Sequence, residues 1–314
     1  ETARPTGSLG YIHRVQLPPP AAREKGYTLE GRNYTRIKMP ERDLTEEEAQ
    51  ELVSAAPRTD LLAFRELGQK YLITGELAYL QAARRVLLAM AALYERDPDR
   101  HPTWPEETNA RFIFATWDAV EEAPVFSDAE RIRVTNLLLP FLYSLVRKTS
   151  GYGNLERNDT IIWNHTTFPL LGLYWGGRYF RRYYDSVFMD TFLKKAEGAF
   201  RGQETCWKPQ CDADSYLTLT IGHMIEYALA EDRMAFFESG NIRLYADYLI
   251  GICDNRGWAA GFGDSGMVRS TAIPDAGLPC AFWYTRDPRY LGYLNSIRSA
   301  DWVNPYHQDV VPEA

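Results

Sequence analysis

The sequence predicts an all-α protein: an incomplete α/α toroid, a barrel of helical hairpins with long loops. Apolar residues recur at three- and four-residue spacing in most segments after residue 43, and no convincing segment alternates as a strand would. The nine or ten expected helices come in successive pairs without a fixed repeat length, which disfavours a solenoid. Abundant aromatics and Gly-containing connections favour a toroid with a central groove.

The expected elements can be placed in chain order. Residues 1–43 are predicted to be an irregular lead-in, and residues 44–314 a helical domain whose first helix, "LTEEEAQELVSAA", has Thr45 as its N-cap. The next expected helices are "DLLAFRELGQKYLIT", "ELAYLQAARRVLLAMAALYERD", "EETNARFIFATWDAVEEA" and "SDAERIRVTNLLLPFLYSLVRKT", followed by residues 161–180, 183–200, 214–231 and 232–253. Ser127 or Asp128 is expected to cap the fourth of these, and two short helices are expected after a Gly-rich loop.

Composition narrows the classes of function. The 314 residues are 45% hydrophobic and 25% charged, which is enough for a sizeable core. No run of apolar residues is long enough for a membrane span. The net charge of -7 disfavours nucleic acid as a partner. The four cysteines, at 206, 211, 253 and 280, match no zinc template, and a Cys206–Cys211 disulfide and four thiols both stay open.

The first unusual polar group is the stretch "WNHTT", which interrupts the apolar run "TIIWNHTTFPLLGLYWGG". If Asp159 or Thr160 caps this helix, Asn164 and His165 fall in its first two turns, where neighbouring residues can face one groove. Trp163 is then available for packing or for stacking on a sugar ring. The alternative is a capping amide beside a hydrogen-bonded core histidine.

A second polar group lies in "CDADSYLTLTIGHMIEYALAEDR". Tyr216, His223 and Tyr227 have the spacing of one helix face, so three proton-carrying groups would share it. The acidic residues just before Tyr216 are expected to begin the helix there. The alternative is an amphipathic helix whose tyrosines bury their rings and expose their hydroxyls.

Two isolated residues complete the candidates. Asp264 lies in "GFGDSG", where repeated glycine would let the backbone approach a ligand, although a tight turn explains the pattern equally well. Arg111 lies among apolar residues in "ARFIFATWDAV" and needs an acidic partner, either Asp118 or a ligand carboxylate.

Together these motifs resemble the α/α-toroid polysaccharide lyases, the heparinase II/III-like and oligoalginate lyase group. The resemblance covers roughly residues 60–295 and rests on their order along the chain: a helix with an arginine, an Asn-His pair that opens a helix, a tyrosine after an acidic loop, and a Gly-Asp turn. Members usually continue into a β-sandwich domain, so the chain is expected to be a toroid-only relative or part of a longer protein. A secreted or periplasmic location is expected.

The resemblance implies roles for particular residues. Asn164 and His165 match the pair that neutralises a uronate carboxylate, and Tyr216 matches the tyrosine that acts as base or acid, with Tyr227 in reserve. Arg111 matches a basic residue on an early helix. The expected partner is an anionic polysaccharide or oligosaccharide, and His223, Tyr227, Trp163 and Asp264 are expected to help bind it. The chemistry requires no metal or other cofactor.

This chemistry is consistent with the residues. The proton beside a uronate carboxylate is weakly acidic, so hydrogen bonds must stabilise the enediolate that forms when it leaves. A tyrosine that acts as base needs nearby positive charge to lower its pKa. Two alternatives remain: a glycoside hydrolase using two of Asp212, Asp214, Glu226 and Asp264, and a non-catalytic carbohydrate-binding scaffold.

Overall fold

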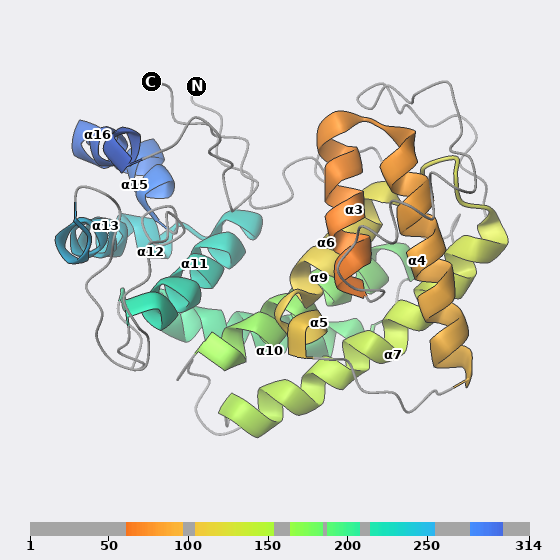
Figure 1. Cartoon of the computed structure of the whole chain (residues 1–314). Helices are drawn as coiled ribbons and strands as arrows, with labels where there is room; N and C mark the ends of the chain where they lie inside the picture. Colours follow the sequence, from red (N-terminus) through yellow and green to blue (C-terminus); the bar gives the residue numbers. More distant parts are fainter. Residues whose placement is uncertain are drawn as a thin grey trace. The chain divides into compact units, whose positions relative to one another are not determined.

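The computed structural model describes residues 61–96, 104–153, 164–184, 187–207, 214–254 and 277–297. These residues form α-helices joined by short connections, and no β-strand occurs among them (Figure 1). The prediction of an all-α protein is therefore confirmed. The lead-in at 1–43 and the first expected helix lie outside the described residues.

The helices follow the expected order with two differences. They are α3 (Leu61–Thr74), α4 (Leu77–Arg96), α5 (Trp104–Thr108), α6 (Ala110–Val120), α7 (Asp128–Gly153), α9 (Asn164–Tyr184), α10 (Met189–Gln203), α11 (Asp214–Ala230), α12 (Ala235–Glu238), α13 (Asn241–Ile252), α15 (Leu278–Thr285) and α16 (Pro288–Ile297). A turn at Asn109 divides one expected helix into α5 and α6. Gly240, at φ 83°, divides another into α12 and α13, because a left-handed backbone cannot continue a helix.

The described residues fall into two compact units. The α3–α6 unit comprises residues 61–96, 104–148, 168–184 and 187–194, and the α11–α16 unit comprises residues 149–153, 164–167, 195–207, 214–254 and 277–297. One helical domain over residues 44–314 is the prediction from the sequence, whose local patterns do not report which distant segments pack together. Each unit consists of segments that are separated along the chain.

Trp117 of α6 lies at the centre of the α3–α6 unit. Helices α3 and α4 form an antiparallel hairpin, and α6 packs against α3 (Figure 1). The Trp117 ring is fully buried and makes edge contacts with Phe64 and Phe126. Its Nε1 donates to the Tyr179 hydroxyl at 3.1 Å, and this hydroxyl donates to Glu121 Oε2 at 2.8 Å. The buried polar atoms at the centre are thus paired with one another, which lowers the cost of burying them.

Helix α7 begins at a capping box. The Glu130 backbone N–H donates to the Ser127 hydroxyl, and the Ser127 N–H donates to the Glu130 carboxylate at 3.0 Å. Of the two residues expected to cap this helix, Ser127 is the one that does so. Glu130 also pairs with Arg84 of α4, which ties the start of α7 to the α3–α4 hairpin.

The α11–α16 unit is stabilised by a stacked pair of aromatic rings and by contacts of Glu204. Phe200 of α10 stacks on Tyr227 of α11, with ring centroids 4.7 Å apart. Arg233, which follows α11, makes a two-pronged ion pair with Glu204, whose backbone carbonyl accepts from Asn241 Nδ2 at 3.1 Å. The ends of α10, α11 and α13 are therefore joined around Glu204.

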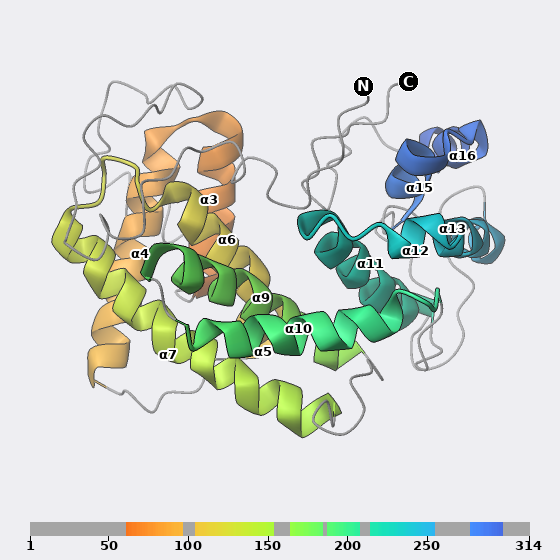
Figure 2. The ribbon, with the colours of Figure 1, turned by 180° about the vertical axis from the view of Figure 1, so that it is seen from behind.

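Helices α15 and α16 complete this unit (Figure 2). The buried Tyr290 of α16 donates from its hydroxyl to Asp247 of α13 at 3.1 Å. Of the cysteines, Cys206, Cys253 and Cys280 carry thiols rather than disulfides, so the Cys206–Cys211 bridge is not formed.

Candidate functional site

A short hydrogen bond joins the "WNHTT" stretch to α11. The Thr167 hydroxyl and His223 Nδ1 are 2.6 Å apart, and both residues are buried in the α11–α16 unit. Which group donates depends on the tautomer of the imidazole. Two motifs that the sequence places fifty-six residues apart are therefore in direct contact.

Asn164 and His165 are the first two residues of α9. They lie in the turn that ends at Thr167, whereas the predicted cap, Asp159 or Thr160, and the predicted start at residue 161 lie outside the described residues. Pro169 lies inside this helix and has no N–H, so it cannot donate the usual helical hydrogen bond to the His165 carbonyl. The first turn of α9 lies at the positive end of the helix dipole, which favours negative charge nearby.

Helix α11 begins at Asp214, as predicted, and places Tyr216 in its first turn. Tyr216 precedes His223 by seven residues, or two helical turns, which corresponds to about 10 Å along the axis. His223 is 2% exposed. Its observed contact is to the α9 turn, so it is placed to position that turn.

Tyr227 occupies a different environment from the one expected of a proton-transfer residue. Its ring is buried against Phe200, and burial, assisted by Glu231, raises the pKa of the Tyr227 phenol far above its usual value. A phenol with a raised pKa is a poor general base at neutral pH. This environment favours Tyr216 over Tyr227 for the base role.

The other predicted site residues lie elsewhere. Arg111 is buried in the α3–α6 unit, with its guanidinium carbon 4.3 Å from the centroid of the Phe112 ring. Trp163, Asp264 and the side chains of Asn164, His165 and Tyr216 lie outside the described residues. The structure thus brings the first turn of α9, which carries Asn164 and His165, into contact with α11 at His223.

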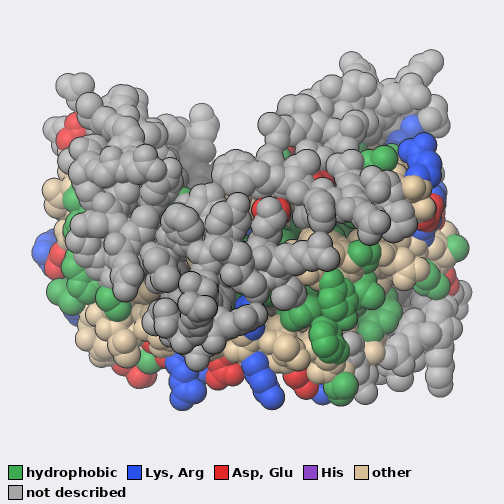
Figure 3. All heavy atoms as spheres, turned by 90° about the horizontal axis from the view of Figure 1, so that it is seen from below, with side chains coloured by type: hydrophobic (Ala, Val, Ile, Leu, Met, Phe, Trp, Pro, Cys, Tyr) green, Lys and Arg blue, Asp and Glu red, His purple; other side chains and the backbone are tan. Residues whose placement is uncertain are grey.

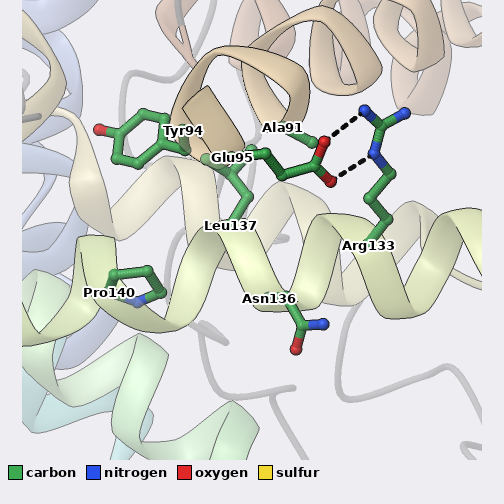
Figure 4. Close-up of a pocket in the computed structure, with 7 residues that line it drawn as sticks. All are labelled: Ala91, Tyr94, Glu95, Arg133, Asn136, Leu137 and Pro140. Carbon is green, nitrogen blue, oxygen red and sulfur yellow. Dashed lines mark hydrogen bonds and ion pairs between the residues drawn. The ribbon is translucent and has the colours of Figure 1, made fainter. Parts of the chain in front are cut away.

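A pocket lies between α4 and α7 (Figure 4). It is lined by Ala91, Tyr94, Glu95, Arg133, Asn136, Leu137 and Pro140 and has a volume of about 240 Å³. Glu95 and Arg133 form a two-pronged ion pair at its edge, with both hydrogen bonds at 2.7 Å. Sites for small molecules usually enclose about 300–1,000 Å³, so this pocket is small for a sugar ring and its substituents.

In the part of the chain that the structure describes, no three His, Cys, Asp or Glu side chains gather in a way that could hold a metal ion. None of the helices in this part is both long and apolar enough to cross a membrane.

Comparison with known proteins gives no assignment. No protein-family model, curated protein or solved structure matches the chain.

Two residues with notable contacts in the structure, Thr167 and Arg65, were not among the candidates predicted from the sequence. Thr167 lies two positions after His165 in the quoted motif, but a threonine among apolar residues carries little signal without its partner. Arg65 of α3 lies beside Arg111 in space, and its sequence neighbours match those of an ordinary amphipathic helix.

Proposed function

We propose that the chain is a polysaccharide lyase that cleaves a uronic-acid-containing polysaccharide by β-elimination, on an incomplete α/α toroid. The observation that carries this proposal is the hydrogen bond between Thr167 and His223. It supports a common site for the Asn-His turn of α9 and the tyrosine-bearing face of α11, the two motifs that the chemistry needs together.

In the proposed reaction, Asn164 and His165 neutralise the uronate carboxylate, so that the carbanion formed at C5 is stabilised as an enediolate. A base removes the C5 proton, the C4–O bond breaks, and a C4–C5 double bond forms. The leaving oxygen takes a proton from an acid, so atoms and charge balance without an oxidant or a cofactor. Tyr216 is the acid, and it or His165 is the base.

His223 has an indirect role in this proposal. Because it is buried against Thr167, it holds the first turn of α9 in place, whereas Asn164 and His165 contact the substrate. Catalytic groups must be positioned closely for rate enhancement, so loss of this contact should lower the rate without removing a reacting group.

The test is a screen of anionic polysaccharides for new ultraviolet absorbance, which arises only from the conjugated double bond of an elimination product. The Tyr216→Phe and His165→Ala variants should lose this absorbance. Tyr284→Phe is the control, because Tyr284 is a partly exposed tyrosine whose ring is tilted against that of Phe237, and it is outside the proposed site. New reducing ends without absorbance would indicate a glycoside hydrolase instead. Binding without turnover would indicate a carbohydrate-binding scaffold.

A further inference from the structure

Helix α7 turns an uncharged face outward. At about 100° per residue, six of its exposed or half-exposed positions fall within about 100° of one another around the axis. These positions, called here the α7 stripe, are Ala129, Ile132, Asn136, Leu139, Pro140 and Tyr143. A surface helix usually carries charged residues on its outward face, whereas the polar groups of the α7 stripe are one amide and one phenol.

The α7 stripe continues into an exposed aromatic cluster. The Tyr143 ring stacks on Phe188, which directly precedes α10, with ring centroids 5.6 Å apart, and both rings meet the buried Phe192 edge-on. Tyr143 is 41% exposed, Phe188 and Ile132 are 50% exposed, and Val187 is 70% exposed. All of these residues belong to the α3–α6 unit, so the stripe and the cluster form one surface of a single compact unit.

The size of this surface is that of one side of a small interface. An aromatic side chain buries roughly 150–250 Å² when it is fully covered, so the exposed fractions of the four side chains leave on the order of 400 Å² of apolar surface. Two such surfaces in contact would remove about 800 Å² from water, and because homodimer interfaces are about 65% apolar, the whole contact would bury about 1,200 Å². Specific interfaces bury about 1,200–2,000 Å², so this area suffices.

The charges beside the α7 stripe distinguish between kinds of partner. Arg131 and Arg133 are paired with Asp128 and Glu95, so they offer no uncompensated positive charge to an anionic polysaccharide or to an anionic lipid surface. A second copy of the chain needs no such charge. Because each copy has a net charge of -7, an uncharged face is where two copies can meet with least repulsion.

We propose that a second copy of this chain covers the α7 stripe, in a symmetric dimer whose two α7 helices run antiparallel. The aromatic end of each stripe, at Tyr143, then lies against the smaller Ile132 end of the other copy. A parallel pair would instead bring the two aromatic clusters together, and large residues pack best against small ones. The opposite charges at the ends of the helix dipoles also favour the antiparallel arrangement.

Asn136 gives this pairing a polar contact near its centre. Contact of Ile132 with Tyr143 puts the twofold axis between residues 137 and 138, so the two Asn136 residues lie about 4.5 Å apart along the helix axis. Pro140 has no N–H and cannot donate to the Asn136 carbonyl, which can therefore accept from the amide of the other copy. An amide both donates and accepts, so the contact is the same in both directions, as an isologous interface requires.

Sedimentation velocity of the full chain, over a range of protein concentrations, tests the proposal. We expect a dimer at micromolar concentration. Ile132→Lys and Tyr143→Glu should each raise its dissociation constant at least about a hundredfold, because each leaves an unpaired charge inside the contact. The control is Ile73→Lys, because Ile73 is also an exposed isoleucine on a helix of this unit, and its replacement should leave the dimer unchanged.

A mixture of the two variants tests the antiparallel arrangement. A heterodimer of Ile132→Lys with Tyr143→Glu places the introduced lysine against the introduced glutamate at one end and keeps the original pair at the other end. The equimolar mixture should therefore dimerise at least about tenfold more tightly than either variant alone. Circular dichroism shows whether each variant is folded. Ile132→Gln, which adds no charge, should give a smaller loss and keeps the test decisive if a charged variant does not fold.

The proposal fails if the unmodified protein stays monomeric up to about 100 µM. A monomer whose stability falls on Ile132→Lys would show that a segment of the same chain covers the α7 stripe. A dimer that survives both substitutions, or that Ile73→Lys weakens equally, forms through another face. A mixture no tighter than the single variants overturns the antiparallel pairing. The dimer does not depend on the proposed lyase activity, so a failure of the ultraviolet screen leaves it standing.

Discussion

The imidazole of His223 and the hydroxyl of Thr167 are buried together, and a hydrogen bond of 2.6 Å joins them. Replacement of Thr167 by Val keeps the shape of the side chain and removes its hydroxyl. We expect Thr167→Val to lower the free energy of unfolding by about 1–3 kcal/mol, the usual cost of leaving a buried polar group unsatisfied. Urea unfolding measures this difference.

Thr167→Ser provides the matched comparison, because it keeps the hydroxyl and loses only a methyl group. It should retain more stability than Thr167→Val, and more ultraviolet activity on any substrate found. If Thr167→Val is as stable as the unmodified protein, the hydrogen bond to His223 is not what fixes the first turn of α9.

Tyr290 supplies a prediction about alkaline pH. Burial and its hydrogen bond to Asp247 raise the pKa of the Tyr290 phenol from 10.0 to about 12. The unfolded chain therefore loses this proton first, so the contribution of Tyr290 to stability is complete below pH 10 and is lost as the pH rises to about 12.

The measurement is urea unfolding of the unmodified protein and of Tyr290→Phe at several pH values. The stability advantage of the unmodified protein should be constant near neutral pH and shrink through the alkaline range. Use of the difference cancels the titration of the other tyrosines. An advantage that stays constant up to pH 12 would show that the Tyr290 phenol ionises equally in both states.

At the scale of the helix, two glycines that look alike in the sequence have opposite roles. A Cβ atom added at Gly172 of α9 would lie 2.7 Å from the Ala110 Cβ and 2.6 Å from Leu145 Cδ1. One added at Gly292 of α16 would meet no atom within 4 Å. Gly172 thus allows α9 to pack closely, whereas Gly292 contributes no packing.

We expect Gly172→Ala to destabilise the protein by about 1–3 kcal/mol, because the clash outweighs the gain in helix propensity. Gly292→Ala should stabilise it by about 0.5–1 kcal/mol, because it removes backbone freedom from the unfolded chain. Thermal and urea unfolding of both variants test these signs. Equal effects at the two positions would contradict the difference in packing.

At the scale of the molecule, the α3–α6 unit is discontinuous along the chain. Tyr179 of α9 accepts a hydrogen bond from Trp117 and donates one to Glu121, so the buried centre of this unit depends on residues after 168. A fragment of residues 1–148 lacks Tyr179. It should therefore leave polar atoms at the centre unsatisfied and expose apolar surface.

We expect fragment 1–148 to show no cooperative unfolding transition in urea, as followed by circular dichroism. Fragment 1–203, which restores α9 and completes α10, is the comparison and should recover cooperativity for this unit. A transition of equal steepness in both fragments would show that the N-terminal helices fold without α9.

Local patterns in the sequence anticipated most of the helices. Apolar spacing predicted the bounds of α3, α4, α7 and α11 closely, because the buried face of an amphipathic helix repeats apolar residues every three or four positions. The divisions at Asn109 and Gly240 were missed, since a single residue can end a helix inside a continuous apolar pattern. These local patterns carry no information about the two compact units, because that division depends on which distant segments pack together.

The exposed surface shows why sequence alone is a weak guide to sites. Large hydrophobic side chains such as Ile73 and Val187 are 70% exposed, and hydrophobic side chains reach the surface among the described residues (Figure 3). Conversely, the polar His223 and Glu226 are almost fully buried. From residue type alone, Ile73 and Val187 would be expected in the core and His223 and Glu226 at the surface.

The sequence by itself determined the all-α class, the start of α11, and the motifs that support a lyase proposal, because helix periodicity and capping are local. Only the tertiary structure decided that Thr167 meets His223, that Tyr227 is buried against Phe200, and that Arg65 lies beside Arg111. These contacts join residues far apart in the chain, and they form because burial of apolar surface selects one packing of helices, which no local pattern encodes.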